Sequence, residues 1–382
     1  MGTGRAGKIT RRDIAKADSL PALIKQLVKR IADGNAEVKE HSAAALASIA
    51  QQHHGEHTDV LYTSGAVKPL VLLLEHGSAD AQANASMALA AVAQGKPAHQ
   101  AAIVNAGGVA PLAALLKNGG AHVQEQAAAV LAAIDSDVTH QQSIIAAGCV
   151  PCLVAMLKGA SDTSKAYAAQ AIANAAAYAE DEQISIAKAG AVPLLLGLLA
   201  TGKGQRPAAA ALSKLAAGNA TVQAEIAEAG GIAPLLALLN GRSTDAQVQA
   251  AAALSEMARG NATTQSEIAK AGGIGPLLAL VMSRNPQAQS QGMGALAQLA
   301  TNNKDNQDAI ERMGGISPLV QLLGVRGSIR SNRAYPLLPH TKSATHLECG
   351  SCCCALIMSS AGGQQSECAS ARGSRAGGNL SR

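Results

Sequence analysis

Two short motifs have the residue types of a phosphate-binding loop and of a redox site. Residues 2–8 read GTGRAGK, in which glycine amides and Lys8 could hold phosphate groups. Ile9, however, stands where such a loop needs a magnesium-binding serine or threonine, and no strand can precede a loop that starts at residue 2. Cys149 and Cys152 have redox spacing but lack the βαβ setting of a thioredoxin-like motif, so we expect them to pack inside the protein. We therefore predict no cofactor.

Histidines and cysteines also form two local clusters that could bind a metal ion. His53 and His57 could share a helix face, but His54 and Glu56 between them do not complete a ligand set, so we expect a solvated junction. Four cysteines in residues 349–354 lie in a Ser/Gly/Arg-rich stretch without helical period. Disorder is our expectation there, with acylation or metal binding as the alternative. No nucleophile, base and orienting group come together, which predicts a protein that is not an enzyme.

The elements that must position any functional residue belong to a repeat of 40 to 42 residues. Its centre is a glycine that occurs seven times, as Gly65, Gly107, Gly148, Gly190, Gly230, Gly272 and Gly314. Leucine or isoleucine stands four residues before each of these glycines, valine or isoleucine two after, and leucine five after. A period of this length is typical of stacked helical units, which places function on a repeated surface rather than in a pocket.

Each repeat can be divided into three helices, as residues 219–260 illustrate. Asn219 is a good N-cap for a short first helix that ends at the glycine pair beginning with Gly230, because glycine readily takes the positive φ that ends a helix. Pro234 fits the first turn of a leucine-rich second helix. Leu254 and Met257, three residues apart, place one apolar face on a longer third helix.

This unit of three helices resembles the armadillo repeat, and the resemblance covers residues 18–324. We count six complete units between two partial ones. The resemblance implies an all-α fold, a right-handed superhelical α-solenoid with three helices in each unit. Residues 1–17 are expected to form a disordered basic N-terminus and residues 325–382 a disordered tail rich in Gly, Ser, Cys and Arg.

Charge and composition restrict the partner class. The chain has a net charge of +5, but residues 1–16 carry +4, residues 325–382 carry +5, and the array between them carries −4. An acidic array argues against nucleic acid and favours a basic or polar polypeptide. No apolar run reaches membrane-spanning length, and Ala6 replaces the serine or threonine that myristoylation at Gly2 prefers, so no transmembrane segment or lipid anchor is expected. We expect a cytoplasmic protein, with the nucleus as the alternative.

In armadillo proteins that resemble this chain, the third helices line a concave groove. Importin-α-type members place an asparagine there, with a tryptophan four residues earlier. Asn174 is the only match to that asparagine, and the chain contains no tryptophan. The chain is therefore closer to cytoplasmic armadillo scaffolds than to import receptors.

One position two turns before the asparagine slot is polar in almost every unit. Its residues are His41, Asn84, Gln126, Tyr167, Pro207, Gln249 and Gln291. Such a row could pair with the backbone of an extended peptide, and the alternative is a plain solvated helix face. The fourth unit is the richest, since Tyr167, Gln170, Asn174 and Tyr178 share one face.

Together these features predict a non-catalytic scaffold or adaptor that binds partner polypeptides along the groove, without cofactor or metal. Two alternatives stay open: a divergent nuclear-import adaptor, and a regulatory subunit of an enzyme or cytoskeletal assembly.

Overall fold

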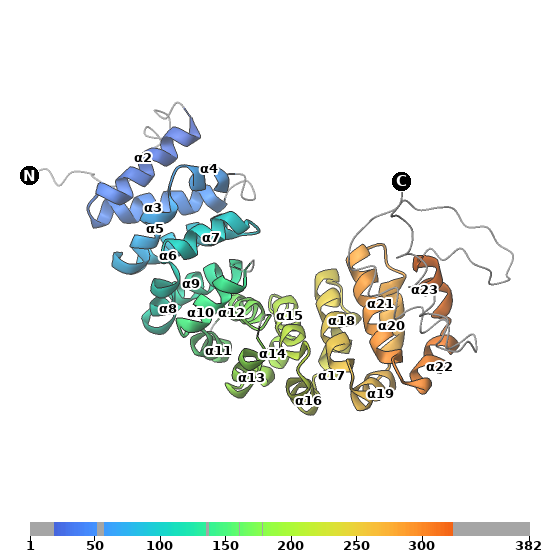
Figure 1. The fold of residues 1–382 in the computed structure, drawn as a ribbon. Coiled ribbons are helices and arrows are strands. Elements are labelled where there is room, and N and C mark those ends of the chain that lie inside the picture. Colours follow the sequence, from blue (N-terminus) through green and yellow to red (C-terminus); the bar gives the residue numbers. More distant parts are fainter. Residues whose placement is uncertain (1–18, 52–56, 135–136, 160, 178, 324–382) are drawn as a thin grey trace, which may run out of the picture. The chain divides into compact units, whose positions relative to one another are not determined.

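The computed structural model describes residues 19–51, 57–134, 137–159, 161–177 and 179–323. The disorder expected for residues 1–17 and 325–382 lies outside these ranges, as do His53, His54, Glu56, Tyr178 and the cysteines of the tail. All regular elements of the described chain are α-helices, which confirms the all-α solenoid predicted from the repeat (Figure 1). None of these helices is long and apolar enough to cross a membrane alone; three sharply bent pairs reach that length only together.

The helices fall into two compact units, one up to Leu215 and one from Ala216. In the first unit the first helices of the repeats are α4 (Thr58–Thr63), α7 (Pro97–Asn105), α10 (Val138–Ala146) and α13 (Glu180–Lys188). The second helices are α2 (Leu20–Asp33), α5 (Val67–His76), α8 (Val109–Asn118), α11 (Cys149–Gly159) and α14 (Ala191–Leu198). The third helices are α3 (Ala36–Gln51), α6 (Ala79–Ala93), α9 (Ala121–Ala133), α12 (Asp162–Ala175) and α15 (Gln205–Ala216).

The second unit repeats the same order of helices. Its first helices are α16 (Ala220–Glu228), α19 (Ala262–Lys270) and α22 (Lys304–Arg312). Its second helices are α17 (Ile232–Leu239), α20 (Ile274–Val281) and α23 (Ile316–Leu323), and its third helices are α18 (Thr244–Ala258) and α21 (Pro286–Ala300). Asn219 caps α16 as predicted, because its side chain accepts a hydrogen bond from the amide of Val222.

The repeated glycine separates the first helix of each repeat from the second. All seven of these glycines have φ between 71° and 83°, a left-handed conformation that side-chain-bearing residues rarely adopt. In three repeats the two helices on either side of the break are bent by 77° to 84°. A second set of left-handed residues, which the repeat pattern did not indicate, lies between the third helix and the next first helix: Gly95, Gly218, Gly260 and Asn302.

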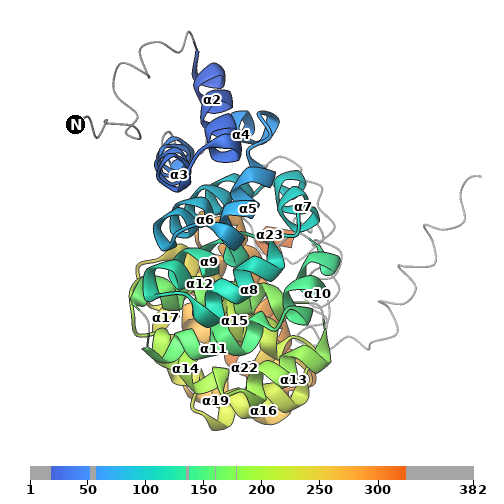
Figure 2. The same cartoon turned by 90° about the vertical axis from the view of Figure 1, so that its left-hand side faces the viewer.

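The core consists of the apolar positions that recur with the glycine. The leucine or isoleucine four residues before it and the leucine five after it are at most 1% exposed in every repeat. The third helices α3, α6, α9 and α12 pack against one another in order, as do α18 and α21 in the second unit. Their contacting faces are largely alanine, which allows close helix packing. Within the first unit, Figure 2 shows α6, α9 and α12 on one side and α7, α10 and α13 on the other.

A glutamine on each of six first helices fastens the repeats together. These residues are Gln100, Gln141, Gln183, Gln223, Gln265 and Gln307. In each case Nε2 donates to the carbonyl oxygen seven residues earlier, over 2.6 to 3.2 Å. These carbonyls lie at or just past the end of a third helix, where no helical amide is available to them. The glutamines therefore add a side-chain donor to carbonyls at the helix ends, four of which also accept a backbone amide.

Candidate functional site

The polar row predicted from the sequence lies on the third helices. Its members in the first unit are His41 on α3, Asn84 on α6, Gln126 on α9 and Tyr167 on α12, and in the second unit Gln249 on α18 and Gln291 on α21. We call these six residues the third-helix stripe. Tyr167 is exposed and the other five are half-buried. Pro207, which holds the same position in the first turn of α15, is buried and leaves a gap in the stripe. Because successive third helices pack together, the stripe of each unit follows one face of its helical layer.

Hydrogen bonding distinguishes the stripe from the structural glutamines. His41 places Nδ1 at 2.7 Å from the carbonyl oxygen of Glu37. Within the part of the chain that the structure describes, no hydrogen bond is made by the side-chain amides of Asn84, Gln126, Gln249 and Gln291. A half-buried amide without a partner offers both a donor and an acceptor. These are the two groups that an extended polypeptide backbone requires.

On α12 a chain of hydrogen bonds links three consecutive third helices. Asn174 Nδ2 donates to the carbonyl oxygens of Ala132 at 3.1 Å and Ile134 at 3.2 Å, at the end of α9. Gln170 Nε2 donates to Asn174 Oδ1 at 3.0 Å. Arg206 Nη1, from α15, donates to Gln170 Oε1 at 3.2 Å.

Asn174 differs from the sequence expectation. We expected it to be an exposed groove residue, but it is 8% exposed and its amide hydrogens are used inside the protein. It therefore positions α12 against α9, and Tyr167 and Gln170 remain the accessible residues of this repeat. Tyr178 lies outside the described residues.

The cysteine motif is a packing feature, as expected. Cys149 begins α11 and is fully buried, whereas Cys152 is half-buried. Burial raises the pKa of the Cys149 thiol to about 12, with a smaller contribution from Cys152. The thiol is therefore protonated at neutral pH and cannot act as a thiolate nucleophile.

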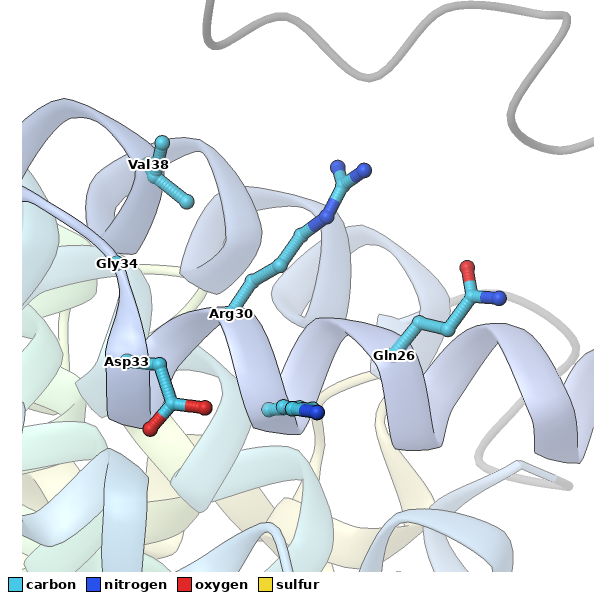
Figure 3. A pocket seen from close by; sticks show the side chains of 6 residues that line it. Gln26, Arg30, Asp33, Gly34 and Val38 are labelled. Atoms are coloured by element: carbon cyan, nitrogen blue, oxygen red, sulfur yellow. The ribbon is translucent and has the colours of Figure 1, made fainter.

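The described residues contain no group of three His, Cys, Asp or Glu side chains that could hold a metal ion. Two surface hollows lie away from the stripe. One is lined by α22 residues Asp305, Asp308, Glu311 and Arg312. The other lies at α2 and the start of α3 and is lined by Gln26, Lys29, Arg30, Asp33, Gly34 and Val38; Figure 3 shows Gln26 and Arg30 projecting to one side of α2. Neither hollow includes a stripe residue, so the candidate site is an extended surface.

A polar cluster on the first helices was not identified from the sequence. His99 of α7 is 6% exposed and stacks on Tyr62 of α4, with ring centroids 4.1 Å apart. Its Nε2 lies 3.3 Å from Asp59 Oδ1, and Lys96 Nζ lies 2.7 Å from the same oxygen. The hydrogen bond from Lys96 is the main reason that the pKa of Asp59 is lowered. The cluster joins two consecutive first helices. His140 takes the place of His99 in the next repeat, but the four residues do not recur together, so no period reveals the cluster.

Comparisons with known proteins agree with this architecture. The family model of the armadillo/beta-catenin-like repeat matches residues 96–132 and 222–259, which correspond to the helix triplets α7–α9 and α16–α18. A search of curated proteins gives no significant match.

Three solved structures show how far the similarity extends. An engineered protein from the Northeast Structural Genomics Consortium is 30% identical, with a TM-score of 0.69 over 88% of this chain and 78% of its own. A designed armadillo repeat protein is 30% identical, with a TM-score of 0.56 over 61% of this chain and 99% of its own. A structure of computationally designed armadillo repeat proteins for modular peptide recognition is also 30% identical, with a TM-score of 0.53 and the same coverage.

Proposed function

This chain belongs to the armadillo-repeat family, and on that premise we propose that it is a non-catalytic scaffold or adaptor that binds partner polypeptides along the third-helix stripe. The observation that carries the proposal is the set of four half-buried amides, Asn84, Gln126, Gln249 and Gln291, which make no hydrogen bond with the described residues. These unpaired amides do not stabilise the fold through hydrogen bonds. Other glutamines in the array, such as Gln124, donate to backbone carbonyls.

Geometry supports an extended peptide as the ligand. Packed helices lie about 8–10 Å apart, and an extended chain advances about 3.3 Å per residue. One stripe amide is then available for about every two to three peptide residues. The similarity to computationally designed armadillo repeat proteins for modular peptide recognition supports the same class of ligand.

The partner proposed is a polar or basic polypeptide over most of the stripe. The array carries a net charge of −4, and exposed Glu37, Asp80 and Asp245 lie in the first turns of α3, α6 and α18. Neither nucleic acid nor a lipid anchor is part of the proposal, and the cytoplasm is the proposed location, with the nucleus as the alternative. The nuclear-import alternative is not favoured, because Asn174, its one matching residue, has its amide engaged within the protein.

Crosslinking mass spectrometry of the native protein tests the proposal by identifying the partner and the residues it touches. We expect crosslinks on the third helices, and a synthetic peptide of the crosslinked partner segment should then bind the purified chain. The variant Asn84→Ala/Gln126→Ala should bind this peptide about fivefold to 150-fold more weakly, because two backbone pairings are lost, each contributing about 0.5–1.5 kcal/mol.

A matched control replaces two amides that are exposed but lie off the stripe, Asn105 on α7 and Asn118 on α8. The variant Asn105→Ala/Asn118→Ala should keep the affinity of the unmodified chain. Equal affinities for both variants would place the interface on another face and refute the proposal.

A further inference from the structure

One repeat-length segment of the array has the opposite charge to the rest. Residues 183–224 contain four basic residues and no aspartate or glutamate, although the array as a whole is negative. Three of the four, Lys203, Arg206 and Lys214, are exposed and lie on α15 or in the turn before it. The other third helices of the first unit, by contrast, contain acidic residues, such as Glu37, Asp80 and Glu125.

Two of these cations, Lys203 and Arg206, contact side chains of α12. Arg206 Nη1 is 3.2 Å from Gln170 Oε1, and Lys203 Nζ is 3.3 Å from Thr163 Oγ1. Tyr167 lies between Thr163 and Gln170 on the same helix and is 36% exposed. Arg206 and Lys214 are eight residues apart on α15, which puts their backbones about 12 Å apart along the helix and about 80° apart around it.

The positive charge of Arg206 and Lys214 is not neutralised within the described structure. No carboxylate of the described residues lies within ion-pair distance of either side chain. Lys203 is different, because its charge acts on Glu125 of α9. Arg206 uses one N–H on the neutral amide of Gln170, so its side chain is held in place while the other donors stay available.

We propose that Arg206 and Lys214, with Tyr167 and Gln170 beside them, bind an acidic stretch of the partner polypeptide. A guanidinium donates two parallel hydrogen bonds to a carboxylate or a phosphate, and Lys214 adds a second positive charge further along the helix. Tyrosine at this position supplies the aromatic contact that interfaces favour. The inference rests on the proposed function, because it requires a peptide that lies along the third helices.

The partner segment then has a charge pattern, acidic opposite α15 and polar or basic opposite the earlier repeats. Because a stripe of similar amides would accept a peptide in several registers, one acidic position selects a single register. Peptides shifted by two or three repeats would place their acidic group near Glu125 on α9 or Asp80 on α6 instead, which is unfavourable.

Selection of random short peptides displayed on phage, using the full chain as bait, tests the inference without a known partner. The unmodified chain should enrich peptides with a local cluster of Asp or Glu. The charge-reversed variant Arg206→Glu/Lys214→Glu should enrich Lys or Arg at that place instead. The control variant Lys25→Glu/Lys29→Glu makes the same charge change on exposed residues of α2 and should select the same peptides as the unmodified chain. Circular dichroism should show equal helicity for the unmodified chain and both variants.

Synthetic copies of the best peptide complete the test by fluorescence anisotropy. A copy with Asn and Gln in place of Asp and Glu should bind about tenfold more weakly, which corresponds to about 1.4 kcal/mol. A copy with phosphoserine at the acidic position distinguishes phosphate from carboxylate as the preferred group.

The outcomes separate this inference from the proposed function. The inference is overturned if the selected peptides lack acidic residues. It is also overturned if their affinity is unchanged in the variant Arg206→Glu/Lys214→Glu. If the same peptides still lose affinity on Asn84→Ala/Gln126→Ala, binding along the stripe stands. Affinity that survives both sets of changes, or a selection that yields no binding peptide, overturns both.

Discussion

The Nε2 atom of Gln100 lies 2.7 Å from the carbonyl oxygen of Ala133, so a single side chain on α7 reaches the end of the following third helix. The same atom also donates to the carbonyl oxygen of Ala93 at 3.0 Å, at the end of the preceding third helix. One buried amide thus joins α6, α7 and α9. Stability of a solenoid depends on such contacts between neighbouring repeats, because each repeat is too small to be stable alone.

Replacing Gln100 with methionine, which has similar volume, should lower the free energy of unfolding by about 1–3 kcal/mol. The change leaves the buried carbonyl of Ala133 without its side-chain donor, whereas the carbonyl of Ala93 keeps the backbone amide of Lys96. Urea unfolding followed by circular dichroism measures the effect, with exposed Gln26→Met on α2 as the control. Equal stability of the two variants would mean that the carbonyl of Ala133 finds another donor.

Tyr167 and Asn174 should separate binding from stability. Tyr167→Ala should leave the free energy of unfolding within about 0.5 kcal/mol of the unmodified chain, because the side chain is exposed and makes no hydrogen bond with the described residues. It should weaken peptide binding by about 2 kcal/mol if it is an interface hot spot.

Asn174→Ala should instead destabilise the chain by about 1–3 kcal/mol, because the carbonyl of Ala132 loses its side-chain donor, whereas that of Ile134 keeps Gln141. Thermal unfolding and peptide titration of both variants check the two statements. A stable Asn174→Ala variant with lost binding would return Asn174 to the binding surface.

Two glycines of the second unit should respond to alanine in opposite directions. A Cβ added at Gly272 or at Gly294 meets no atom within 4 Å, so neither change causes a clash. Gly272 has φ +83°, and alanine in this left-handed conformation costs roughly 1–2 kcal/mol. Gly294 lies inside α21, where alanine should stabilise by roughly 0.5–1 kcal/mol. Melting temperatures of the two variants should therefore move apart, and a shift of the same sign would contradict the conformational explanation.

Stability should depend on pH through Glu125 on α9. Partial burial works to raise the pKa of Glu125, but hydrogen bonds from Ser164 and Ser161 on α12, with the charges of His122 and Lys203, lower it below its ordinary value of 4.5. A pKa that folding lowers gives stability that is present above the unfolded value and is lost as the pH falls through the folded value.

Glu125→Gln should therefore be less stable than the unmodified chain at neutral pH, and the difference should shrink as the pH falls below about 4. Urea unfolding over a pH series measures this difference. Glu228→Gln, which changes an exposed carboxylate without a hydrogen bond in the described structure, is the control and should show a smaller effect at every pH.

The sequence by itself determined where helices begin and end and which residues form the core. Those features are local: glycine takes positive φ, proline fits a first turn, and apolar residues three or four apart share a face. Repetition at 40 to 42 residues then made each local signal visible seven times. The second set of left-handed residues was missed because glycine holds that position in only three of the seven repeats, as Gly95, Gly218 and Gly260. The cluster at His99 was missed because it occurs once.

Only the tertiary structure decided what each polar side chain does. Gln124 and Gln126 lie two residues apart on α9 and are the same residue type, yet Gln124 Nε2 donates to the carbonyl oxygen of Leu116 at 2.9 Å while Gln126 has no partner among the described residues. Asn174 likewise matched a binding position by spacing, but its amide donates to carbonyls at the end of the neighbouring helix α9. A hydrogen bond depends on where the carbonyls of other helices come to lie, and the residue pattern of one helix does not contain that information.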